Sequence, residues 1–299
     1  MPKPNPLREI LGDLPFTAEI DWMLRSKNRP RKDHYNLTRL LTSLPDAVKV
    51  VKPYAESTPR GKNVLFFATL HYWIEQSAYV GLVLAGMGHD VTLLTLPYSE
   101  WHKEKDKFTQ RQRILHTHDA LKMLSPLVKH ISMLDMQSSS RASHGTLHAH
   151  TASELPERIQ TDIKEISLWD VQYTLMREEV DMNDAGDRAL YDLRVERNTF
   201  AAKAALQYMQ ANKPDVVLIP NGLILEMGIV FRVARYLGID AVTYEFNDQR
   251  EQIWLAQNSS IMQQDTDYLV EARCSQPMTD AMFERVADLE NARRGARVW

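Results

Sequence analysis

Three short polar segments of this sequence each follow an apolar run and carry side chains suited to chemistry on hydroxyl groups. They contain His71, the pair Asn221 and Gly222, and Glu245. A neutral imidazole is a general base for a hydroxyl near physiological pH, and a side-chain amide both donates and accepts hydrogen bonds. A carboxylate at the end of an apolar strand needs a partner or a task. These residue types together predict a site for a hydroxyl-rich ligand such as a sugar.

His71 lies in the segment Thr69–Tyr72, between a predicted strand and a predicted helix. The dipole at the amino end of a helix lowers the proton affinity of an imidazole, which favours a general base, and Glu75 lies one turn further on to orient it. Tyr72 follows directly, and we predict that it contacts the substrate. The alternative is a histidine that caps the helix or packs against its neighbours, because position rather than residue type supports the catalytic interpretation.

The second segment reads IPNGLILE and contains Asn221, Gly222 and Glu226. Glycine has no side chain, so the N–H of Gly222 is able to approach a ligand closely. Asn221 offers a donor and an acceptor to the same ligand. Glu226 is either a further substrate contact or an acidic residue stabilised by the dipole of the helix whose first turn it occupies. The alternative for the whole segment is an ordinary turn between a strand and a helix.

The third segment reads TYEFNDQR. We predict that Glu245 takes part in catalysis and that Asn247 binds substrate, because polar side chains gathered after a buried strand suit the recognition of hydroxyl groups. Asp248 and Arg250 follow closely. The alternative is a loop whose polar groups bond only to one another.

The first two segments occupy corresponding places in two predicted strand–helix–strand units, and the third follows the last strand of the second unit. In the first unit, apolar runs at 63–69 and 90–96 flank an amphipathic helix at 73–87. In the second, strands at 215–220 and 240–245 flank another amphipathic helix. Apolar strands that alternate with helices predict a Rossmann-like parallel sheet with helices on both faces. Such sheets bind ligands at the carboxyl ends of their strands, where the strand order reverses, so we expect the three polar segments to lie at one edge.

The first part of the chain has a different pattern. We expect residues 1–60 to form an irregular, partly helical extension that its prolines interrupt, Pro45 and Pro53 among them. One Rossmann-like domain then occupies residues 61–299. Further predicted elements are a strand at 130–135 and helices at 151–212 and 277–295.

Composition and motif spacing exclude several kinds of site. The net charge of −3 gives no signature of nucleic-acid binding. The single cysteine, Cys274, excludes an intrachain disulfide and a cysteine-based zinc site, and the histidines lack the HExxH spacing, so we expect no metal. Glycines follow the first predicted helix rather than precede it, and no GxxxxGK[ST] motif occurs. We therefore expect no dinucleotide cofactor and no P-loop.

The compartment is predicted from what the sequence does not contain. Its first residues lack the apolar core of a signal peptide, and no apolar run approaches the length of a membrane span, so we expect a cytoplasmic protein. The segment LRSKNRPRK at 24–32 carries five basic residues next to the amphipathic-looking IDWML. It is either a solvated loop or a peripheral contact with anionic lipid headgroups.

Two stretches resemble the amino-terminal half of GT-B glycosyltransferases. NVLFFATLHYWIEQSAYVGLVLAGMGHDVTLLTL at 63–96 is similar to that family's opening strand, helix and strand. KPDVVLIPNGLILEMGIVFRVARYLGIDAVTYE at 213–245 resembles the part of capsular and exopolysaccharide glycosyltransferases in which one strand ends in Asn-Gly and the next in Tyr-Glu. The two stretches together cover under a quarter of the chain.

The resemblance implies transfer of a sugar from a nucleotide-sugar donor to a sugar or glycolipid acceptor, without an essential metal. In this family the amino-terminal domain mainly binds the acceptor, and a residue of the first strand-to-helix joint acts as base or contacts the transferred sugar, which by position is His71. Asn221, Gly222 and Glu245 would line the cleft. The stretch after Glu245 is too short for a second domain that binds the donor, so we expect the N-terminal half of an enzyme. The alternative is a non-catalytic sugar- or nucleotide-binding module that acts through a partner.

Overall fold

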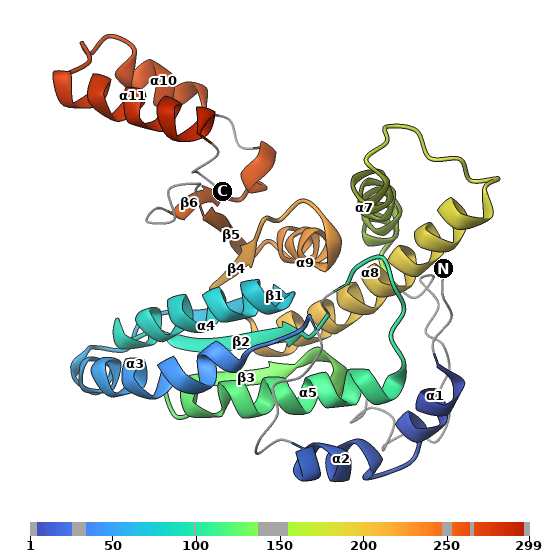
Figure 1. Cartoon of the computed structure of the whole chain (residues 1–299). Helices are drawn as coiled ribbons and strands as arrows, with labels where there is room; N and C mark the ends of the chain where they lie inside the picture. The colour runs from blue at the N-terminus through green and yellow to red at the C-terminus, as the bar shows by residue number, and fades with distance from the viewer. Residues whose placement is uncertain are drawn as a thin grey trace.

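The chain forms an α/β structure built around one six-stranded sheet (Figure 1). The coordinates are a computed structural model. The residues that the structure describes are 5–25, 34–98, 100–136, 155–246, 253–263 and 266–295.

The sheet is parallel except at one edge. Its order is β3-β2-β1-β4-β5-β6, and only β6 runs antiparallel to its neighbour, β5. The strands are β1 Asn63–Thr69, β2 Asp90–Leu96, β3 Val128–Ser132, β4 Val216–Pro220, β5 Asp240–Phe246 and β6 Ile253–Gln257. The predicted third strand is present but begins and ends earlier in the chain than expected, and β6 was not predicted.

Helices connect the strands and cover the sheet. They are α1 Pro6–Asp13, α2 Thr17–Arg25, α3 Thr38–Ser57, α4 His71–Gly86, α5 Lys107–Leu121, α7 Glu157–Leu175, α8 Ala185–Asn212, α9 Leu225–Tyr236, α10 Asp267–Arg273 and α11 Asp280–Arg294. Helix α4 packs on β1, β2 and β3, whereas α9 packs on β1, β4 and β5 and is itself covered by α7 and α8. This arrangement confirms the predicted Rossmann-like sheet with helices on both faces.

The N-terminal extension is more regular than expected. Pro45 and Pro53 lie inside the 20-residue helix α3 instead of interrupting it. A proline within a helix removes one backbone hydrogen bond. Helix α3 places Leu40, Leu44 and Val48 in the main core, and such packing of an apolar face supplies most of the stability of a helix in a protein. Tertiary packing therefore outweighs the two missing hydrogen bonds.

The last two helices lie apart from the sheet. Figure 1 shows α10 and α11 beyond β6, away from α4 and α8. No residue of α11 is buried. The predicted helix at 277–295 is thus present, but it adds nothing to the core. Within the described residues, none of the helices combines the length and apolar composition needed to cross a bilayer.

Candidate functional site

The strand order reverses between β1 and β4, which identifies the binding edge of this sheet. Strand β1 is hydrogen-bonded to β2 on one side and to β4 on the other, and both pairings are parallel. The register pairs Phe66 with Leu218, so the segments that follow Thr69 and Pro220 leave the sheet side by side. Open α/β sheets bind ligands at this kind of position. The structure therefore brings the first two predicted segments together.

His71 is the first residue of α4, and its conformation is set by the residue before it. Leu70 is a buried leucine with a φ of 62°, a value that side-chain-bearing residues rarely adopt. The partly buried His71 ring lies edge-on to two tyrosines, with centroids 6.3 Å from Tyr35 and 5.4 Å from Tyr72. Strained backbone of this kind concentrates at functional sites.

Glu75, the predicted orienting residue, lies one turn along α4. Its carboxylate forms an ion pair with Arg39, with Oε2 4.0 Å from Nη1. Burial raises the pKa of Glu75, and the charge of Arg39 opposes that shift. The structure thus gives Glu75 a cationic partner from α3.

Asn221 organises the turn after β4 and links it to β5. It adopts a left-handed conformation with a φ of 58°. Its Oδ1 accepts hydrogen bonds from the backbone N–H groups of Leu223 at 3.0 Å and Ile224 at 3.3 Å, which is an Asx-type turn. The Asn221 backbone N–H donates to the carbonyl of Tyr244 at 2.9 Å, and its side-chain amide lies close enough to Glu245 to lower the pKa of that carboxyl. One residue therefore connects the second and third predicted segments.

Gly222 is required by internal packing. Its φ is +78°, and a Cβ at this position would lie 2.3 Å from Cγ2 of Thr243 on β5. Its N–H, which the sequence suggested for ligand binding, donates to the Pro220 carbonyl at 2.6 Å. Strand β5, and not a ligand, therefore occupies the space that the missing side chain of Gly222 leaves.

Glu245 and Tyr72 both lie on this edge, near enough for the charge of Glu245 to affect the tyrosine. Burial raises the pKa of Glu245, and the nearby side-chain amide of Asn221 opposes the shift. Burial also raises the pKa of Tyr72, with further contributions from Tyr173 and from the charge of Glu245. Tyr72 nevertheless keeps 42 % of its surface exposed. A half-buried carboxylate beside an accessible aromatic ring can both hydrogen-bond and stack.

Two buried aromatic residues lie under this group. The ring of Trp73 is 5.8 Å from that of Tyr244 at an interplanar angle of 82°, and Tyr72 lies 5.7 Å from Trp73. The hydroxyls of Tyr244 and Ser77 are 2.7 Å apart, and burial raises the pKa of Tyr244. Packed aromatic rings therefore support the site from below.

Of the two remaining predicted site residues, one is not described by the structure and the other lies in the interior. Asn247 lies outside the described residues, as do Asp248 and Arg250. Glu226 is 1 % exposed, and its carboxylate accepts a hydrogen bond from Arg194 at 2.8 Å. The Glu226 side chain is therefore buried in the protein interior.

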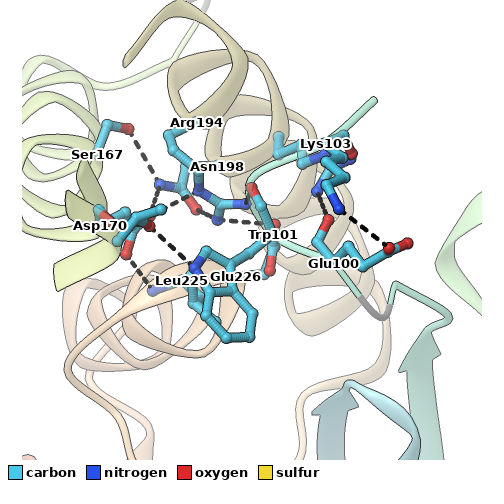
Figure 2. Close-up of polar contacts among 11 residues, drawn as sticks. Glu100, Trp101, Lys103, Ser167, Asp170, Arg194, Asn198, Leu225 and Glu226 are labelled. Carbon is cyan, nitrogen blue, oxygen red and sulfur yellow. Dashed lines mark hydrogen bonds and ion pairs between the residues drawn. The ribbon is translucent and has the colours of Figure 1, made fainter. Parts of the chain in front are cut away.

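Glu226 belongs to a buried polar network that sequence reasoning missed (Figure 2). Arg194 donates to Glu226 and, from Nε at 3.0 Å, to Asp170. Asn198 donates to the same Asp170 carboxylate, whose other oxygen accepts the backbone N–H of Leu225 at 2.6 Å. The network joins α7, α8 and the start of α9. It therefore fixes the turn that carries Asn221.

A polar cleft adjoins the carboxyl end of β2. It has a volume of ≈ 810 Å³ and is lined by residues of α1, α5 and α8. Arg197 lies in its wall, 4.4 Å from the centroid of the Tyr98 ring, and donates to the carbonyls of Glu100 and Lys103. These bonds fix the loop that leads from β2 to α5.

Comparisons with known protein families, with curated proteins and with solved structures found no match to this chain. The site's geometry must therefore carry the functional argument. Among the residues that the structure describes, no three His, Cys, Asp or Glu side chains are grouped so that they could hold a metal ion. His116 illustrates this, because its Nε2 accepts the backbone N–H of Leu37 at 2.9 Å inside the core.

Proposed function

We propose that this chain binds the acceptor in a GT-B-type glycosyltransferase, and that the acceptor site consists of Tyr72, Asn221 and Glu245 with His71 at its side. The observation that supports this most is the 2.9 Å hydrogen bond from the backbone N–H of Asn221 to the carbonyl of Tyr244, which holds the segment after β4 beside Glu245 next to the reversal of the strand order. It joins two predicted polar segments at the edge where α/β sheets bind ligands.

The residue types suit a sugar. The Asn221–Glu245 pair offers acceptors and an amide donor to neighbouring hydroxyls, and the exposed Tyr72 ring provides a face against which a sugar ring stacks. In an inverting reaction the oxygen of the acceptor hydroxyl bonds to the anomeric carbon of the donor sugar, and the nucleoside diphosphate leaves. His71 accepts the proton of that hydroxyl. In a retaining reaction His71 contacts the transferred sugar.

Saturation-transfer NMR on the full chain with a panel of saccharides and nucleotide sugars tests the proposal. We expect at least one saccharide to bind, and Glu245→Gln or Tyr72→Ala to weaken it roughly tenfold or more, because bonds to a charged group contribute about 1.5–3 kcal/mol. Tyr236→Ala is the matched control, since Tyr236 is 47 % exposed on α9. Wherever transfer is measurable, His71→Ala should lower its rate about a hundredfold.

Two results would contradict the proposal. If Glu245→Gln and Tyr72→Ala bind the saccharide as strongly as the control Tyr236→Ala does, the ligand binds elsewhere. Tight binding of a nucleotide sugar to this chain, lost in Glu245→Gln, would favour the alternative of a nucleotide-binding module.

A further inference from the structure

The outward side of α1 is apolar. Leu7, Ile10 and Leu14 are 62 %, 60 % and 47 % exposed. Their spacing of three and then four residues places them in one stripe along the helix. Gly12, which is buried, lies on the opposite side.

The outward side of α2 continues this surface. Phe16 precedes the helix and is 70 % exposed, and Ile20, Met23 and Leu24 are 55 %, 75 % and 82 % exposed. Ala18, in the first turn, is fully buried. Figure 1 shows α1 and α2 next to each other along α5, at the end of the molecule remote from α10 and α11. We call the seven exposed side chains of Leu7, Ile10, Leu14, Phe16, Ile20, Met23 and Leu24 the α1–α2 face.

The inward sides of the same helices are polar. From α1, Arg8 donates to Asp106 at 3.2 Å and to Thr109 at 3.0 Å. From α2, Trp22 donates to Asp119 at 2.7 Å. A surface helix of a globular protein normally turns its apolar stripe to the core and its polar side to water. Both N-terminal helices do the reverse.

The reversed orientation is fixed by close packing on α5. A Cβ on Gly12 would lie 2.5 Å from Cβ of Lys107 and from the backbone nitrogen of Phe108, so α1 lies directly on the first turn of α5. Arg111 donates to the carbonyls of Gly12, at 2.9 Å, and Leu14. It also forms an ion pair with Glu19. The apolar stripes are therefore held outward by the contacts that position the helices.

The segment that follows α2 along the chain is basic, whereas α1 and α2 themselves carry charges of both signs. Arg25 ends α2, and the sequence has no acidic residue from Trp22 to Lys32 but five basic ones. Residues 26–33, which contain four of these five, lie outside the described part of the chain. An apolar helical face with neighbouring Lys and Arg matches an anionic bilayer surface, whose headgroups are negative and whose acyl boundary is apolar.

We propose that the α1–α2 face binds the surface of an anionic lipid bilayer and enters its interfacial layer. Large contiguous apolar surfaces on a folded chain mark sites of interaction with proteins or membranes, and the neighbouring basic residues favour the membrane. None of the seven side chains belongs to the proposed acceptor site at Tyr72, Asn221 and Glu245, so this inference is independent of the proposed sugar binding. Glu9, Gly12 and Asp13 of α1 also line the polar cleft beside β2, so bilayer docking brings that cleft close to the headgroups.

Sedimentation with vesicles tests the inference on the full chain. We expect the wild type to bind vesicles of phosphatidylcholine with about 30 % phosphatidylglycerol more strongly than pure phosphatidylcholine, and to be weakened by about 0.5 M salt. The double substitution Phe16→Glu with Met23→Glu should lower the bound fraction about tenfold or more. The matched control is Phe283→Glu with Val286→Glu, which changes side chains 58 % and 52 % exposed on α11 and should bind as the wild type does.

A second measurement does not depend on the charged variants. Met23→Cys in a Cys274→Ser background provides one reactive thiol, because Cys274 is the only cysteine. An environment-sensitive fluorophore there should shift to the blue with anionic vesicles, whereas the same label at Phe283→Cys should not. A wild type that stays in the supernatant with anionic vesicles, or a label at position 23 that does not respond, would overturn the inference. So would a Phe16→Glu, Met23→Glu variant that binds vesicles normally but loses a wild-type self-association seen by sedimentation velocity.

Discussion

Replacement of Arg194 by methionine should be among the most destabilising substitutions in this chain. Its guanidinium is 0 % exposed and lies 3.0 Å from Asp170 and 2.8 Å from Glu226, whose side chains are 0 % and 2 % exposed. It also donates to Asn198 at 3.3 Å and to the Trp101 carbonyl at 3.3 Å. Methionine fills much of the volume but leaves two buried carboxylates without their cation.

The size of the effect follows from this burial. Removal of one partner from a buried ion pair costs about 3–5 kcal/mol, a large part of the about 5–15 kcal/mol by which a typical protein is stable. Arg188→Met is the matched control. It lies on the same helix and pairs with Asp192, but both side chains are 59 % exposed. Exposed pairs of this kind contribute about 0–1 kcal/mol.

The pH dependence of the stability loss in Arg194→Met shows whether unpaired buried carboxylates cause it. Burial already raises the pKa of Asp170 in the wild type, although Arg194 opposes the shift. Without that cation the folded-state pKa of Asp170 rises further. A carboxyl whose pKa is higher in the folded than in the unfolded state takes up its proton first in the folded state. The stability deficit of Arg194→Met should therefore be largest near about pH 7 and shrink as the pH falls towards about 5.

Urea unfolding followed by far-UV circular dichroism measures these free energies. In the Arg194→Met background, Asp170→Asn with Glu226→Gln should recover a large part of the loss, because both carboxylates are then neutral and Asn still accepts the Leu225 N–H. A loss below about 1 kcal/mol, a loss equal to that of Arg188→Met, or a deficit that grows on acidification would refute the reasoning.

Two further predictions concern glycine and histidine positions. Gly222→Ala should lower the free energy of unfolding, measured in urea, by about 1–3 kcal/mol more than Gly238→Ala does. Both glycines have a positive φ, but only a Cβ at position 222 would clash with Thr243. Equal losses would show that β5 moves to make room for the new methyl group. Burial, aided by His118, lowers the pKa of His130 to about 3. The wild type should therefore lose stability as the pH falls from about 6.5 towards 3, and His130→Gln should flatten that slope; an unchanged slope would contradict it.

The strands that sequence predicted well are those whose signal is local. Strands β1 and β2 begin and end at the predicted residues, because each is an apolar run bounded by polar residues and buried along nearly its whole length. Strand β6 has no such signal. Four of its five residues are exposed, and it forms by pairing with the free edge of β5, which is a non-local event.

The position of the site was predictable, whereas its bonding was not. Topology alone indicates that the residues after β1 and β4 lie side by side. Which atoms meet there depends on β5, because Thr243 fills the space beside Gly222 and the carbonyl of Tyr244 accepts the Asn221 N–H. No rule of spacing connects positions so far apart in the chain.

One sequence signal indicates the buried network. Arg194 and Asn198 follow Leu190 at intervals of four residues, so they lie on the stripe that α8 buries. A charged residue on a buried stripe needs partners, but Asp170 and Glu226 come from two other helices and each resembles an ordinary surface residue. The sequence thus predicts that a partner exists without identifying it.

The network also explains how an unusual backbone at the start of α9 persists. Leu225 is buried and has a φ of 57°, which costs about 1–3 kcal/mol unless the surroundings enforce it. The carboxylate of Asp170 supplies that constraint through its 2.6 Å bond to the Leu225 N–H. The same turn begins with Asn221, whose backbone N–H donates to the carbonyl of Tyr244 and whose side-chain amide lies near Glu245. A defect at Asp170 should therefore weaken ligand binding at Glu245 although the two carboxylates share no contact, and this coupling distinguishes a network that shapes the site from one that only stabilises the fold.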